Sequence, residues 1–203
     1  MLLALAQQQP IVFPESPFVP IAVGFFGLGT GYLIYGPQEL FGVPSRDASV
    51  DRATGMWGIW MPGFLQFITG VYLWVGLTWF KVFAADPLLY MAALAFTAYG
   101  VHWFVIGANR YVQADPRPNG FMAVAFLLIS ILGAIVFFVG GVWPVGLLFA
   151  GLTGVYASDI FASFGSRIGE RSLGLFHVLT GLWLMYLTYA AALNFSLDWN
   201  LPV

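Results

Sequence analysis

Long apolar runs separated by short polar stretches set the pattern of this chain. A helix needs about 20 apolar residues to cross a bilayer, and six windows are that long: roughly 18–36, 55–78, 87–107, 120–140, 142–164 and 171–193. The runs are continuous rather than alternating, which disfavours the strands of a membrane barrel. The pattern predicts an all-α membrane protein with one six-helix domain, residues 18–193. An extramembrane arm, residues 1–17, should precede it, and a tail, residues 194–203, should follow it.

The basic residues fall unevenly between the windows. Of the seven Lys and Arg residues, only Lys81 lies between windows two and three or four and five. The other six lie between windows one and two, three and four, or five and six: Arg46, Arg52, Arg110, Arg117, Arg167 and Arg171. Because Lys and Arg accumulate in cytoplasmic loops, this predicts a cell-membrane protein with both termini outside.

Composition narrows the function. Only 8% of residues are charged and 60% are hydrophobic, against about a quarter charged in soluble domains. A net charge of −2 leaves no basic patch for nucleic acid, so membrane lipid and a small-molecule solute are the expected partners. The chain has no cysteine, phosphate loop or nucleophile–base spacing. These absences predict no enzyme activity and no cofactor.

Two stretches of the chain resemble each other. Residues 58–72 and 141–156 both match G-[IV]-W-x-x-G-[FL]-L followed by T-G-V-Y, with one inserted residue. A true repeat would relate three helices to three in opposite orientation, an arrangement typical of transporters and channels; chance similarity between glycine-rich helices is the alternative. Trp60 and Trp143 are the matched aromatic pair. They are candidates for two pore constrictions, or for an interfacial aromatic belt.

Few ionisable residues lie inside the windows. His102, His177 and Asp159 fall at similar depths toward the arginine-rich side, and such residues cost about 2.5–3.5 kcal/mol to insert, so they face protein or water. They are either a proton-handling cluster, since histidine titrates near neutral pH, or three separately hydrogen-bonded residues. They come from three helices without short ligand spacing, so no metal site is predicted.

Gln66 lies near the centre of the second window. Its amide offers two donors and an acceptor, which suit a carboxylate, urea or water. The alternative is a bond between helices, worth about 0.6–2 kcal/mol in a membrane.

Two stretches resemble the acetate uptake (succinate–acetate) transporter family. Residues 58–70, G-I-W-M-P-G-F-L-Q-F-I-T-G, are similar to its second-helix pattern G-I-F-Y-G-G-x-x-Q-x-x-x-G, and residues 95–103, A-F-T-A-Y-G-V-H-W, to its third-helix pattern A-F-T-S-Y-G-x-F-W. The resemblance implies a hexamer of six-helix protomers, each with its own path for small monocarboxylates. It also implies that Gln66, Thr97, Tyr99 and Trp103 lie on or beside that path.

The chain departs from this family in places. Its first-helix pattern N-P-A-P-x-G-L appears only as S-P-F-V-P at residues 16–20, without the Asn, and His102 replaces a Phe. The urea and short-amide channels are a second resemblance, through Gly63 to Gln66 and through D-P-R-P at residues 115–118, their D-x-R-P. A third possibility is a non-transporting subunit of a membrane complex. The sequence favours a small-solute path, with acetate ahead of urea.

Overall fold

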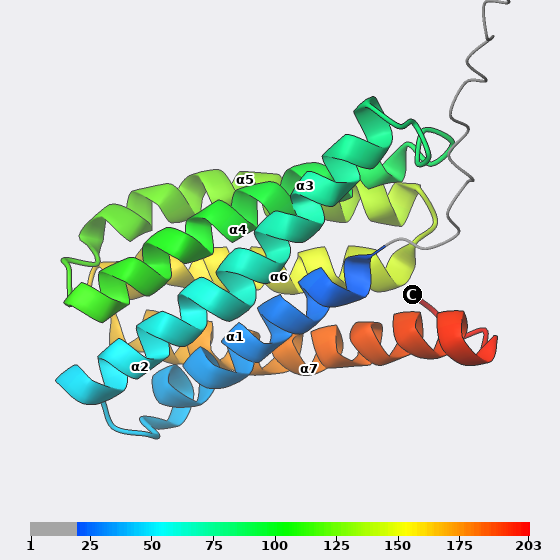
Figure 1. Ribbon diagram of the computed structural model, residues 1–203. Coiled ribbons are helices and arrows are strands. Elements are labelled where there is room, and N and C mark those ends of the chain that lie inside the picture. Colours follow the sequence, from blue (N-terminus) through cyan, green and yellow to red (C-terminus); the bar gives the residue numbers. More distant parts are fainter. Residues whose placement is uncertain (1–19) are drawn as a thin grey trace, which may run out of the picture.

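The computed structural model describes residues 20–203 as a bundle of long helices, without a strand in that range (Figure 1). The helices, in chain order, are α1 (Ile21–Phe41), α2 (Ala48–Gly58), α3 (Leu65–Thr78), α4 (Leu88–Val112), α5 (Arg117–Val139), α6 (Trp143–Ser163) and α7 (Arg167–Leu197), with a π-helical segment, η1 (Ile59–Phe64), between α2 and α3. All six predicted helices are present, and the all-α prediction is confirmed.

The second predicted helix is continuous but not uniform. It runs through α2, η1 and α3, and Pro62 lies inside the π-helical turn. Proline has no N–H to donate to the preceding turn, and a wider π turn is one way for a helix to absorb that loss. On α1, two glycines face this turn: a Cβ at Gly27 would lie 2.6 Å from the Met61 carbonyl oxygen, and one at Gly31 would lie 2.6 Å from Pro62 Cγ.

The helices extend past the predicted windows at the end of the bundle that carries the six arginines, which we call the arginine end. There α1 continues to Phe41, α2 begins at Ala48 and α7 begins at Arg167. Side-chain caps explain two of these starts: Asp47 accepts from the Ser49 and Val50 amides at 2.7 and 2.8 Å, and Ser166 accepts from the Gly169 amide. Hydropathy detects only the membrane-embedded part of each helix, so the predicted loops were too long.

The helices form a closed ring. Each span packs on the next in chain order, and α7 packs along α1. Four glycines allow these two helices to approach closely; for example, a Cβ at Gly174 would lie 2.4 Å from the Leu40 nitrogen. In contrast, α4 and α5 make the loosest contact of any two consecutive spans. The ring order therefore contains one tight seam, α1–α7, and one loose seam, α4–α5.

Five of the spans are long and apolar enough to cross a membrane by themselves, and α1 is not among them. Glycines and Pro37, Gln38 and Glu39 make α1 less apolar. Ile21 and Val203 line one cavity, so the first helix begins and the chain ends on the same side. That side being external stays a prediction. The predicted arm lies outside the described residues, as do positions 16–19 of the family pattern.

The end of the chain folds back on α7. This helix continues to Leu197, past the predicted boundary at 193. Asn194 then binds Leu201 through two hydrogen bonds of 2.8 Å, and the Tyr186 hydroxyl donates to the Pro202 carbonyl at 3.0 Å. These bonds bring Val203 to the mouth of a cavity inside the ring.

Candidate solute path

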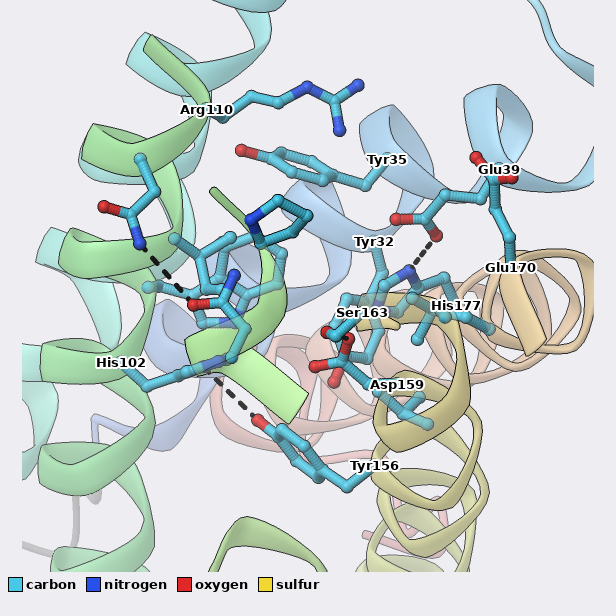
Figure 2. Close-up of a pocket in the computed structure, with 18 of the residues that line it drawn as sticks. Tyr32, Tyr35, Glu39, His102, Arg110, Tyr156, Asp159, Ser163, Glu170 and His177 are labelled. Atoms are coloured by element: carbon cyan, nitrogen blue, oxygen red, sulfur yellow. Dashed lines mark hydrogen bonds and ion pairs between the residues drawn. The ribbon is translucent and has the colours of Figure 1, made fainter. Parts of the chain in front are cut away.

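Two cavities enter the ring from opposite ends. The arginine-end cavity has a volume of about 210 Å³ and is lined mainly by α1, α4, α6 and α7 (Figure 2). The second, which we call the apolar cavity, has a volume of about 240 Å³ and opens beside Ile21, Asp86 and Val203. They share no lining residue. Along three helices they are separated by about one turn: Leu28 and Tyr32, Tyr99 and His102, Leu152 and Val155.

An aromatic layer fills the space between the cavities. Tyr99 stacks on Tyr156 with ring centroids 5.8 Å apart, and Phe126 lies within 5.4 Å of both rings. Tyr32 and Trp103 meet at 5.9 Å on the other side of the layer. All four Tyr and Trp side chains named are buried. The ring is therefore closed at its centre by packed aromatic side chains.

Unpaired polar atoms are concentrated at this layer. Among the described residues, the buried side-chain atoms without a hydrogen-bond partner are Tyr32 OH, Gln66 Oε1, His102 Nε2 and Trp103 Nε1. Leaving such a group unsatisfied costs about 1–3 kcal/mol, so native proteins rarely keep several together unless another molecule meets them. Three of the atoms belong to residues of the arginine-end cavity or its wall, and Gln66 lines the apolar cavity.

An ionic network forms one wall of the arginine-end cavity. Asp51 accepts hydrogen bonds from Arg110 Nε at 2.6 Å and from Arg46 Nε at 3.1 Å. Arg110 also donates to Gln38 Oε1 at 2.6 Å and lies 5.3 Å above the Tyr35 ring. This arrangement ties α1, α2 and α4 together, and it leaves both guanidiniums already paired with a carboxylate.

The predicted proton-handling residues all line the arginine-end cavity, but each has a different partner (Figure 2). His102 Nδ1 lies 3.4 Å from the Tyr156 hydroxyl, and Asp159 accepts from the Ser163 hydroxyl at 2.9 Å. His177 Nδ1 lies 2.5 Å from Glu39 Oε2. The three residues therefore face one space without forming a directly bonded cluster.

Metal binding gains no support from this geometry. Within residues 20–203, no group of three or more His, Asp and Glu side chains lies close enough to hold an ion.

Trp60 and Trp143 lie outside both cavities of this ring, and their role as pore constrictions stays a prediction. Their side chains are 56% and 49% exposed, and neither lines a cavity. Within the matched motifs the inward positions are other residues: Pro62 and Gly63 are buried on η1, as are Pro144 and Val145 on α6. Trp143, at the start of α6, fits the belt alternative, whereas Trp60 lies in the interior of the second span.

The other predicted site residues lie in different places. Gln66 and Tyr99 line the apolar cavity, while Trp103 lines the arginine-end cavity. Thr97 lines neither; its hydroxyl donates to the Ala93 carbonyl and accepts from Trp74 Nε1 at 3.0 Å, in a groove on the outer side of α4. Its bonds make it part of the α3–α4 packing.

The D-P-R-P loop is explained by local structure. Asp115 accepts from the backbone amide of Arg117 at 3.0 Å and from its guanidinium, at the start of α5. The Arg117 guanidinium lowers the pKa of the exposed Asp115 carboxyl to about 2. These bonds shape the helix start without pointing into a cavity.

Sequence reasoning missed most other residues that face the arginine-end cavity, among them Tyr32, Glu39 and Tyr156. Glu39 falls beyond the first hydropathy window, and the tyrosines resemble the many other aromatic residues of the chain. The intramembrane position of His177 was the one available signal, because a buried imidazole calls for a polar partner.

A closed ring of long helices, five of them apolar enough to span a membrane, defines a multi-pass membrane protein. The chain is similar to a solved structure of the bacterial acetate channel SatP, with 18% identity, a TM-score of 0.66, and coverage of 90% of this chain and 96% of that one. No protein-family model and no curated protein matches it. At this identity the similarity shows a shared fold.

Proposed function

We propose that this chain is a membrane channel for small solutes, first of all short monocarboxylic acids such as acetate. The observation that carries the proposal is the set of unpaired polar atoms at the aromatic layer between the two cavities. Tyr32 and Trp103 can donate there and Gln66 Oε1 can accept. A carboxylic acid offers both a donor and an acceptor, so it can satisfy atoms of either kind as it crosses.

The charges of the arginine-end cavity favour the neutral form of such an acid at the layer. Its lining includes the carboxyls of Glu39, Asp159 and Glu170 and the guanidiniums of Arg46 and Arg110, and both arginines are paired with Asp51. Neither guanidinium is therefore free to bind the anionic form of the acid. Because moving a bare carboxylate into an apolar environment is costly, we expect acetate to cross the layer protonated.

Uptake of labelled acetate into vesicles that contain only this chain tests the proposal. Flux should exceed that of protein-free vesicles. At a fixed total concentration it should fall by about tenfold per pH unit above the pKa of the acid, as the neutral form becomes scarce. Flux equal to that of empty vesicles contradicts the channel. Flux that ignores the neutral-acid concentration contradicts the protonated route.

Urea and short amides are the second candidate solutes. The apolar cavity carries a buried amide, Gln66, and a neutral amide solute can pair with it in both directions. Labelled urea and acetamide belong in the same vesicles as acetate. Faster urea than acetate flux at every pH, under equal gradients, would reverse the order of the two candidates.

Assembly is part of the proposal. The sequence resemblance to the acetate uptake family implies a hexamer in which each protomer has its own path, and we propose this assembly. Native mass measurement in detergent should give six copies. Consistent copurification with other subunits, together with no flux from the isolated chain, would instead support the non-transporting subunit.

A further inference from the structure

A third void lies in the wall of the ring at the loose seam between α4 and α5. It is a groove of about 690 Å³ whose lining is mostly apolar, with Val101, Val105 and Met122 among its residues. Val101 and Val105 are 46% and 52% exposed, so the groove opens on the outer side of the ring. Span α5 is also the least buried of the five apolar spans. The groove therefore opens on the outer surface of the ring, where an apolar span is least covered by its own chain.

The groove and the arginine-end cavity share a wall. Four side chains line both spaces: His102, Ile106, Asn109 and Asn119. These four residues therefore stand between the groove and the arginine-end cavity at this seam.

Hydrogen bonding across the seam is uneven. Toward the centre of the membrane the Tyr99 hydroxyl pairs with the Ser130 hydroxyl at 2.9 Å, a normal bond. At the shared wall the bond is Asn109 Nδ2 to Asn119 Oδ1 at 3.5 Å, the far limit of the range. The seam is closed firmly beside Tyr99 and weakly at the asparagines.

The tight seam on the opposite side of the ring shows what closure requires. Between α1 and α7, a Cβ at Gly36 would lie 2.9 Å from Val178 Cγ2, so the helices meet without a void at that point. Across the α4–α5 seam a comparable contact exists only at the far end, where a Cβ at Gly140, just after α5, would lie 2.8 Å from Leu88 Cδ2; among the described glycines none makes such a contact beside the groove. Close packing leaves few voids wider than a water molecule, and the groove is an exception at one seam.

We propose that the α4–α5 seam is a lateral portal through which uncharged, lipid-soluble small molecules pass between the membrane and the arginine-end cavity. The neutral form of a short-chain acid belongs to this class. The apolar groove accommodates the alkyl part, and the Asn109 and Asn119 amides, with the unpaired His102 Nε2, bind the polar part. Only the choice of solute rests on the proposed function, since the portal itself can be tested without transport.

The test uses a reporter cysteine in the shared wall. The chain has no native cysteine, so Ile106→Cys provides a unique thiol. Purified protein in lipid vesicles is treated with N-phenylmaleimide, which is uncharged and lipid-soluble, or with a sulfonated methanethiosulfonate, which is charged and confined to water. Val105→Trp and Met122→Trp then fill the groove from positions that do not line the cavity.

Filling the groove should slow the lipid-soluble reagent by about fivefold or more, because a packed seam leaves no void for it. The charged reagent, which enters through the aqueous mouth, should keep its rate. Leu128→Trp is the matched control: Leu128 lies on α5, is 64% exposed and lines no groove, and its substitution should change neither rate.

Two results would overturn the portal. Equal slowing of both reagents would mean that both enter by the aqueous mouth, and unchanged rates in both tryptophan variants would mean that the groove is no route. A change of oligomeric mass in Val105→Trp or Met122→Trp, measured in detergent, would show that a second copy covers the seam instead of lipid. Vesicle flux of acetate plays no part in these readings, so a failure of the channel proposal would leave them intact.

Discussion

The two cavities of this ring have nearly equal volumes, about 210 and 240 Å³, but very different walls. The arginine-end cavity is lined by carboxyls, guanidiniums and imidazoles. The apolar cavity is lined by aliphatic and aromatic side chains, with Gln66 deep inside and Asp86 as its charged residue. A solute crossing the ring would therefore lose its hydration water abruptly, at the aromatic layer, rather than gradually along the path.

This difference separates two tasks within one chain. A cavity with a polar wall can hold water that hydrates a solute, whereas a cavity with an apolar wall favours solutes that need little hydration. The polar end also carries the ion pairs that join α1, α2 and α4. We therefore expect substitutions at the arginine end to affect folding first, and those at the layer and in the apolar cavity to affect passage.

The largest effect is expected from Asp51→Ala. It leaves the buried guanidinium of Arg110 without its carboxylate, since the Arg110 side chain is only 12% exposed. Breaking a fully buried pair from one side costs about 3–5 kcal/mol, and this part-buried pair, whose Arg110 keeps its bond to Gln38, should lose a fraction of that. Thermal unfolding in detergent should show a clearly lower midpoint. Asp115→Ala breaks the exposed pair with Arg117 and is the matched control, with little expected change of the midpoint because solvent screens an exposed pair. Equal unfolding midpoints for the two variants would contradict the stabilising role of the ion pairs that join α1, α2 and α4.

Gln66→Leu, in the apolar cavity, should affect passage rather than stability. Gln66 Oε1 is buried and unpaired, so the substitution removes an unsatisfied group and should leave the unfolding midpoint equal or higher. Loss of one solute hydrogen bond, about 1–2 kcal/mol, should lower flux roughly tenfold. A lower midpoint with unchanged flux would identify Gln66 as a bond between helices instead.

His102→Phe should have a moderate effect. The ring of His102 packs against Phe126 at a tilt of 37°, with centroids 4.6 Å apart, and one of its nitrogens is unpaired, so a phenyl ring fits while the titratable group is lost. We expect normal protein levels and a flatter pH dependence of flux, measured at a constant concentration of neutral acid. An unchanged profile would make His102 a structural residue of the layer.

The smallest effect is expected from Trp60→Leu and Trp143→Leu. Both side chains face outward and line no cavity, so flux per correctly inserted protein should stay within about twofold of the parent, as for other exposed positions. Insertion efficiency is the required control, since belt tryptophans anchor helices at the interface. A large loss of flux at normal insertion would support the constriction hypothesis.

The fold was predictable because each helix that crosses a membrane needs a long apolar stretch, which is visible in the sequence. Apolar length located all six helices, and arginine placement located one end of the bundle. The helix ends were predicted less well, because α2 and α7 start in polar sequence under the control of the capping residues Asp47 and Ser166. The inverted repeat suggested by residues 58–72 and 141–156 stays a prediction.

The candidate site was only partly predictable. A histidine or glutamine in an apolar run is conspicuous, so His102, His177 and Gln66 were found from sequence. Helical phase is harder to read: the π turn at Ile59–Phe64 changes the phase of the second span, and Trp60 faces outward. The pairing of His177 with Glu39 joins the first helix to the last, and no spacing in the sequence encodes it.

The tight α1–α7 seam has a consequence for the order of biosynthesis. Its first helix is the span that hydropathy favours least, and its partner is the last span to leave the ribosome in the described chain. Domains form as their parts emerge, so α1 must wait in the membrane, with its glycine face uncovered, while five further spans are made. Packing of α1 against α7 is therefore delayed until the last span has been made, and truncation before α7 should leave α1 exposed to quality-control proteases.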